Sequence, residues 1–286
     1  MTVLAPFAPL GRLLGRMSAS DPRAARPAAR RLRERLRLGC LAAAAALAVG
    51  LGAAAPASAQ VDLGAGLSIT GSAAATTDYL FRGISQTRNR GALQGTLELD
   101  HESGLYIGTF LSTATFAGTD NRQELDIFGG FRFETGPVKW DTYVIGYTYP
   151  GYDARPGQFE LSYMEVGARA TVDLGSDVSL TAALNYSPNF FGRSGPGVYI
   201  EGGADWKIPG IDVTLSGRLG YQFIDRYQRF GIANDGYLWY GVTLSRDIYA
   251  GLSASVGFYG TDLSERECGG LKICATRFVG TLTWKF

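Results

Sequence analysis

The chain has 286 residues, of which 46% are hydrophobic, 12% are aromatic and 19% are charged, and its formal net charge is +1. Its mean hydropathy of +0.01 is too low for a bundle of membrane helices, each of which needs about 20 consecutive apolar residues. Residues 60–286 hold 18 basic and 24 acidic side chains, and this net charge of −6 disfavours binding to nucleic acid.

The first 59 residues have the composition of a secretory signal peptide. A long Arg-rich segment is followed by an apolar run, and Ala57-Ser58-Ala59 ends that run as a small-residue cleavage site. The basic segment is long, so Met17 is an alternative start of translation. A transmembrane helix and a lipid anchor at Cys40 are competing interpretations, but alanine dominates the run and the run follows the cysteine.

From Leu67 onward, apolar and polar residues alternate with a period of two, which is typical of half-buried antiparallel strands. The stretch 211–219 shows the alternation most clearly, whereas 105–116 and 138–149 are apolar on both faces and are not oriented by the pattern. Twelve segments are predicted as strands: 66–79, 91–102, 105–116, 123–134, 138–149, 159–173, 178–187, 197–208, 211–222, 236–247, 251–262 and 275–286.

The joins between these segments alternate in length. Five short joins have the composition of tight turns, and six longer joins separate them. An even strand number, with short turns on one side and long loops on the other, is the layout of a bacterial outer-membrane barrel. Because every backbone polar group in lipid must be paired, such a sheet closes on itself. We therefore predict an all-β fold: one transmembrane antiparallel barrel of about 12 strands over residues 60–286, with a soluble sandwich as the alternative.

The last strand supports this prediction. Phe278, Leu282, Trp284 and Phe286 share one face, and aromatic residues prefer the membrane interface. A final strand that ends in phenylalanine is a sorting mark of outer-membrane barrels, so the barrel-insertion machinery is an expected partner.

The first long join carries a distinctive motif, Asp78-Tyr79-x-Phe81-Arg82-Gly83-x-Ser85, followed by Ala92-Leu93-Gln94-Gly95. With Glu124-Leu125-Asp126-x-x-Gly129-Gly130, this pattern resembles the TorF family of porin-like proteins (Gcw_chp type) over most of residues 67–286. The resemblance implies an outer-membrane channel and no particular substrate.

The motif leaves several roles open. For Arg82 we expect a structural pair with Asp78, with contact to lipopolysaccharide phosphate and binding of an anionic solute as alternatives. Gly83 is expected to form a tight bend, and Tyr79 and Phe81 are expected at the rim of the barrel.

Placing the polar strand faces inward gives a set of charged lumen residues. The pore-lining candidates are Glu98, Asp100, Glu124, Asp126, Arg132, Glu165, Arg169, Glu201, Asp205 and Arg218, with Glu134, Asp212, Lys207, Arg277 and Lys285 on the same faces. Their acidic excess predicts a mild cation preference. The alternative is that opposite charges pair across strands and close the lumen, since twelve strands lie between filled and open barrels.

Cys268 and Cys274 are candidates for a disulfide in an exported protein, with free thiols or a metal clip as alternatives. No cofactor and no metal are expected. The single histidine, His101, falls near a predicted short turn, and no G-x-S-x-G, phosphate-loop or H-E-x-x-H motif occurs.

The predicted function is passive diffusion of small hydrophilic solutes or ions across the outer membrane, not catalysis. A plugged structural or surface-interaction barrel is the second hypothesis, and an outer-membrane lipid-active enzyme is the third. Outer-membrane lipid and lipopolysaccharide are the expected surroundings.

Overall fold

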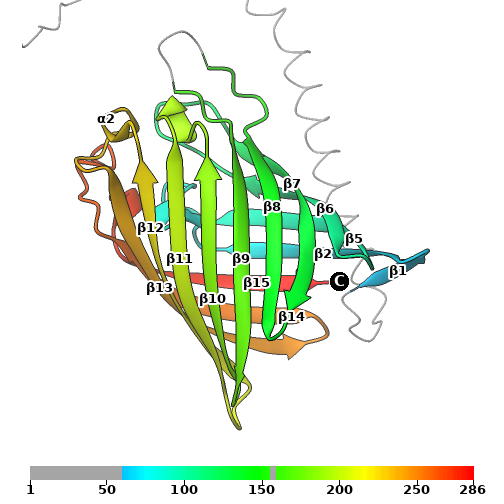
Figure 1. The fold of residues 1–286 in the computed structure, drawn as a ribbon. Coiled ribbons are helices and arrows are strands. Elements are labelled where there is room, and N and C mark those ends of the chain that lie inside the picture. The colour runs from blue at the N-terminus through cyan, green and yellow to red at the C-terminus, as the bar shows by residue number, and fades with distance from the viewer. Residues whose placement is uncertain (1–59, 155–158) are drawn as a thin grey trace, which may run out of the picture. The chain divides into compact units, whose positions relative to one another are not determined.

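The computed structural model describes residues 60–154 and 159–286, so the predicted signal peptide lies outside the described residues. Thirteen strands hydrogen-bond in one sheet, and the pairing of β2 with β5 closes twelve long strands into a barrel, with the short β1 added at one edge (Figure 1). The predicted all-β antiparallel barrel is therefore confirmed.

The long strands match the twelve predicted segments closely. They are β2 (Leu67–Thr76), β5 (Ala92–His101), β6 (Leu105–Thr113), β7 (Gln123–Thr135), β8 (Val138–Thr148), β9 (Tyr163–Gly175), β10 (Val178–Ser187), β11 (Gly197–Ile208), β12 (Val213–Ile224), β13 (Gly236–Tyr249), β14 (Leu252–Thr261) and β15 (Arg277–Lys285). The sequence pattern missed the shortest elements, namely β1 (Val61–Gly64), β3 (Leu80–Phe81), β4 (Ile84–Ser85), the helix α2 (Tyr227–Phe230) and the 3₁₀ turns η1 (Phe191–Arg193) and η2 (Lys272–Cys274).

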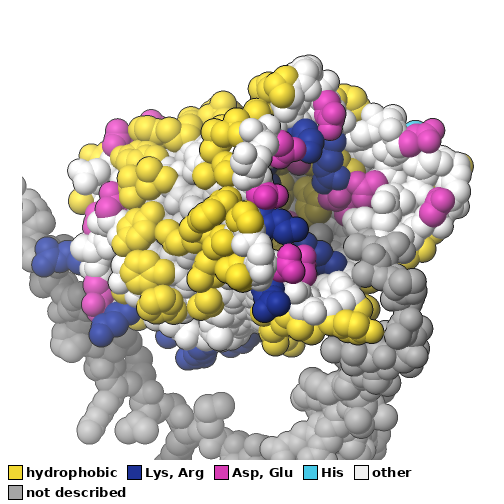
Figure 2. All heavy atoms as spheres, turned by 90° about the horizontal axis from the view of Figure 1, so that it is seen from below, with side chains coloured by type: hydrophobic (Ala, Val, Ile, Leu, Met, Phe, Trp, Pro, Cys, Tyr) yellow, Lys and Arg dark blue, Asp and Glu magenta, His cyan; other side chains and the backbone are white. Residues whose placement is uncertain are grey.

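The alternation of the strands separates an apolar outer wall from a polar lumen. Leu97, Ile107 and Ile127 lie on neighbouring strands and are 47%, 57% and 56% exposed. Seen from the short-turn side, hydrophobic side chains cover the outside, while basic and acidic side chains gather around the opening (Figure 2). No helix in the described ranges has the length and apolar character needed to cross a bilayer.

The barrel closes where the last strand, β15, pairs with β2. β15 pairs with β2 from Thr281 to Lys285, and Phe286 exchanges two backbone hydrogen bonds with Gly71, at 2.9 and 3.0 Å. A Cβ on Gly71 would lie 2.4 Å from the Phe286 ring, so glycine is required for the terminal ring to pack there. β1 continues along the same edge of β2, with Val61 opposite Ile69.

Candidate functional site

The motif in the first long connection forms a small hairpin between β2 and β5. β3 and β4 pair as Leu80 with Ser85 and Phe81 with Ile84, which leaves Arg82 and Gly83 as the two-residue turn. Their φ angles are +47° and +81°, as the favoured two-residue hairpin turn requires.

The turn of the hairpin contacts the inner wall of the barrel at β13 and β14. A Cβ on Gly83 would lie 2.6 Å from Thr261 Cγ2 and 2.9 Å from Trp239 Cβ, so the turn packs directly against β13 and β14. The tight bend expected at Gly83 is present, and the close approach of these strands adds a second reason for glycine. The ring of Phe81 packs edge-on at 5.6 Å against Tyr147, which lies at the long-loop end of β8, so Phe81 is inside the lumen near that end of the barrel.

Arg82 makes the central contact of the hairpin. Its guanidinium donates two hydrogen bonds to the Glu165 carboxylate of β9, at 2.9 and 2.6 Å, and a further one to the side-chain oxygen of Gln222 on β12. The guanidinium lies 3.8 Å from the ring centre of Tyr199 and 4.6 Å from that of Phe81. Because Arg82 and Glu165 are 9% and 1% exposed, this is a buried, two-pronged ion pair.

The expected pair between Arg82 and Asp78 is therefore wrong. Asp78 instead anchors the base of the hairpin, where Ser85 and Thr87 donate to it at 2.6 and 2.8 Å and Arg277 donates at 2.7 Å. The two charges of the motif thus have different partners, one at each end of the hairpin.

The hairpin divides the lumen into two cavities. The turn-side cavity, of about 390 Å³, is lined by Leu80, Phe81 and Arg82 together with charged residues of the barrel wall. The loop-side cavity, of about 300 Å³, is lined by Phe81, Ile84 and other residues near the long loops. Phe81 borders both cavities, so the hairpin is the partition between them.

The turn-side cavity contains both signs of charge. Arg132 donates to Glu98 and Asp100, each at 2.7 Å, and its guanidinium lies 3.7 Å from the ring centre of Tyr106. Tyr106 in turn donates to Asp141 at 2.6 Å. This network joins β5, β6, β7 and β8 through side chains inside the barrel.

The remaining pore-lining candidates fall into three groups. Arg218 donates twice to Asp205, at 2.8 and 2.7 Å, so these two charges compensate each other. Arg169 and Glu201 line the turn-side cavity. Glu124 and Asp126 are different, because they are 1% and 3% exposed in the wall of the loop-side half.

A family model described as a bacterial protein of unknown function (Gcw_chp) matches residues 60–286. The chain belongs to the Gcw_chp family. No match was found among curated proteins.

Solved structures share the fold of this Gcw_chp chain at low identity. It is similar to a structure titled KdgM porin, with 9% identity and a TM-score of 0.51, covering 76% of this chain and 99% of the other. It is also similar to a NanC porin structure, with 7% identity and a TM-score of 0.50, covering 76% of this chain and 98% of the other. At these identities the likeness extends to the fold alone.

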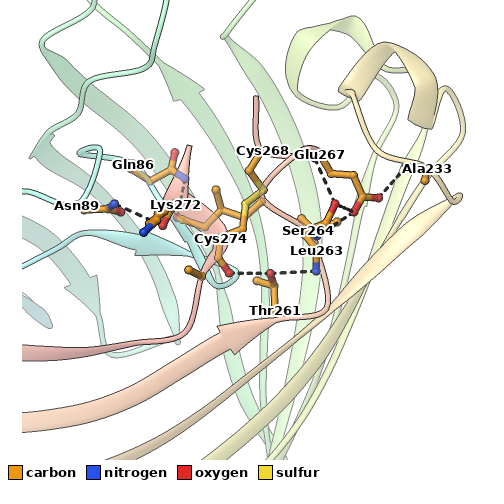
Figure 3. The surroundings of a disulfide bond; sticks show 12 residues. Gln86, Asn89, Ala233, Thr261, Leu263, Ser264, Glu267, Cys268, Lys272 and Cys274 are labelled. Atoms are coloured by element: carbon orange, nitrogen blue, oxygen red, sulfur yellow. Dashed lines mark hydrogen bonds between the residues drawn. A yellow bond between two sulfur atoms is a disulfide. The ribbon is translucent and has the colours of Figure 1, made fainter. Parts of the chain in front are cut away.

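A disulfide between Cys268 and Cys274 shapes the last long loop of the Gcw_chp chain. Within the closed segment, the Lys272 carbonyl accepts a hydrogen bond from Asn89 at 3.4 Å (Figure 3). It also accepts one from the Arg277 guanidinium. The disulfide loop therefore rests on the connection that carries the hairpin.

The same loop is also tied to its neighbour across the rim. Glu267 accepts hydrogen bonds from the Ser264 hydroxyl at 2.6 Å and from the backbone N–H groups of Ser264 and Ala233, each at 2.9 Å (Figure 3). The bonds from Ser264 and then from Ala233 hold the pKa of Glu267 below its usual range. These contacts order the loops above the loop-side cavity.

Several residues of the site carried no sequence signal. Gln222 and Tyr199 are ordinary members of inward strand faces, and only their contact with Arg82 gives them a role. Glu165 was identified as a lumen charge, but its partner lies 83 positions away along the chain. Pairing at that distance depends on strand order, which local patterns do not encode.

Proposed function

We propose that this protein is an outer-membrane channel for small solutes, with the β3–β4 hairpin as its internal constriction. The observation that carries the proposal is a closed barrel with an apolar outer wall and two internal cavities, separated by one hairpin. Only a lipid environment makes such a wall favourable, and only a wet lumen suits the charged interior. The channel activity implied by the TorF resemblance agrees with this arrangement.

The hairpin is held by the polar contacts of Arg82, which water can replace, and by the packing of Phe81 and Ile84 against buried apolar side chains. Arg82 reaches Glu165 and Gln222 across the lumen, and Glu165 also accepts from Asn185 at 3.2 Å. The turn-side cavity borders Arg82 directly, so both charges can become hydrated when the hairpin leaves the wall. We infer that solutes pass when the hairpin is displaced and that the docked hairpin is the narrow state.

The charge preference of the channel should be small. The acidic excess behind the expected mild cation preference is partly compensated, since Asp205 is paired with Arg218, and Glu98 and Asp100 share Arg132. Glu165 is paired with the hairpin itself. Selectivity therefore depends on the few lumen charges that remain available to a passing ion.

Planar-bilayer recordings of the purified mature chain test the proposal. We expect discrete conductance steps, and a reversal potential under a salt gradient that lies close to zero with a small shift toward cations. The runner-up function, a closed structural barrel, gains support from the hairpin that spans the lumen. A folded protein that inserts into the bilayer and never conducts, even with the hairpin residues 80–85 replaced by glycine and serine, would favour that alternative.

A further inference from the structure

The wall of the loop-side cavity contains a buried carboxyl group that has no ion-pair partner among the described residues. Glu124 lines this cavity and is 1% exposed. Its Oε1 accepts a hydrogen bond from the Tyr79 hydroxyl at 3.0 Å, whereas its Oε2 has no hydrogen-bond partner among the described residues. The Oδ1 of the neighbouring Asp126, which is 3% exposed, also has none.

No lysine or arginine of the described ranges forms an ion pair with either carboxylate. This sets Glu124 apart from Glu165, which has Arg82 as its partner in the same barrel. A buried carboxylate without a partner is costly, and a cation brought to it removes that cost. The wall is therefore complementary to positive charge.

Aromatic rings line the same cavity as Glu124. The ring of Phe116 packs edge-on against those of Tyr149 and Phe191, at 5.3 and 5.4 Å, and all three residues line the cavity with Tyr163. Aromatic faces attract cations, and alkylated ammonium groups suit such sites because they lose little hydration on entering them. Apolar walls with one carboxylate suit an amphipathic cation better than a fully hydrated one.

A metal ion fits the same wall less well. Ca²⁺ takes 6–8 oxygen ligands, and Mg²⁺ needs near-octahedral coordination. No group of three or more His, Cys, Asp or Glu side chains within the described residues is arranged to hold a metal. Two carboxylates beside phenol and phenyl rings favour an organic ligand.

We propose that the loop-side cavity is a binding site for a small organic cation, an alkylated ammonium with an apolar substituent. The ammonium group lies against Glu124, and the substituent lies against the rings of Phe116 and Tyr149. A volume of about 300 Å³ is in the range of small-ligand pockets. Arg88 also lines the cavity and opposes a cation, but it is exposed, whereas Glu124 is buried.

The inference deepens the proposed channel by naming a class of solute, and it is tested by binding alone. The probe is benzyltrimethylammonium, titrated by calorimetry into the mature chain in detergent, with benzenesulfonate and CaCl₂ as comparison ligands. We expect saturable binding of the cation and none of the anion. Glu124→Gln should weaken binding at least tenfold, while the control Glu98→Gln, in the other cavity, should leave it within twofold.

A second variant covers the case in which Glu124→Gln does not fold. Phe116→Leu keeps an apolar wall but removes a ring face, so binding of the cation should weaken about three- to tenfold. Equal binding of the cation and the anion, unchanged affinity in both variants, or a response to CaCl₂ alone would each overturn the inference. A barrel that conducts but does not bind the probe would overturn the binding site and leave the proposed channel function intact. A barrel that binds the probe but never conducts would overturn the channel function and leave the binding site intact.

Discussion

Truncating Arg82 is the sharpest test of the constriction. Arg82→Ala removes both hydrogen bonds to Glu165. While the hairpin stays docked, the Glu165 carboxylate, which is 1% exposed, then has no positive partner. Removing one partner of a buried ion pair typically costs about 3–5 kcal/mol. The barrel wall is joined by backbone hydrogen bonds that this change does not touch, so the cost falls on the docked hairpin. When the hairpin leaves, water reaches Glu165 and the cost is relieved.

A shift of this size changes the ratio of displaced to docked hairpin by about two to three and a half powers of ten, since each 1.4 kcal/mol is a factor of ten. Single-channel recordings should therefore show a larger mean conductance or a much higher open fraction than the unmodified chain. Retained heat-modifiable migration on gels would show that the barrel is still folded.

The matched control replaces both charges with apolar groups, as Arg82→Met with Glu165→Leu. Exchanging a whole buried ion pair for apolar side chains is commonly neutral or stabilising. The double variant should therefore stay as closed as the unmodified protein, although it lacks the same arginine. If Arg82→Ala conducts like the unmodified chain while folded, or if the double variant opens as far as the single one, the hairpin is not the constriction.

Three other changes probe the turn, the outer wall and the disulfide. Gly83→Ala adds a Cβ that would lie 2.6 Å from a methyl group of β14, so we expect docking to weaken by about 1–3 kcal/mol and bilayer traces to show partial opening; traces identical to the unmodified protein would contradict this. Leu97→Arg on the outer wall should lower the free energy of folding into lipid vesicles by about 2–4 kcal/mol in urea titrations. Thr96→Arg, on the lumen side of the same strand, is its control, and equal losses in both would argue against a lipid-facing wall. Replacing Cys268 and Cys274 by serine should destabilise the closed loop by about 2 kcal/mol in the chain-entropy model and speed its proteolysis without unfolding the barrel; an unchanged digestion pattern would refute this.

The strands were predictable because each one alternates apolar and polar residues according to which face of the sheet they occupy. β10 and β11 begin and end at the predicted residues, since ten or more alternating positions specify both the period and the turn-forming residues that follow. Segments 105–116 and 138–149 could not be oriented, because tyrosine and phenylalanine occupy lumen positions as well as wall positions. Tyr106 and Tyr147 face inward with their hydroxyls on Asp141 and Glu165, which makes an aromatic residue part of the polar face.

The hairpin could not be predicted, because its strands are too short to show an alternating pattern. β3 and β4 have two residues each, too few to show any period. Locally, Asp78 is the nearest acid to Arg82, and proximity in sequence favours that pair. In the folded chain Asp78 accepts a hydrogen bond from Arg277, 199 positions away. Arg82, in the turn of the hairpin, donates instead to Glu165 of β9. Closure of the barrel decides both pairings.

The choice of an ion pair at the tip of the hairpin bears on whether the barrel is a channel or a plug. A permanent plug would be more stable with apolar side chains, because the cost of burying two charges would not arise. Arg82 instead lines a cavity of about 390 Å³ that is also lined by Arg132, Arg169 and Glu201. Displacing Arg82 into such surroundings exchanges one set of polar contacts for another, while the packing of Phe81 and Ile84 against buried apolar side chains also has to be broken. A reversible constriction requires a contact that is specific when the hairpin is docked and that costs little free energy to break. The ion pair between Arg82 and Glu165 is such a contact, and this favours transport over a permanently closed barrel.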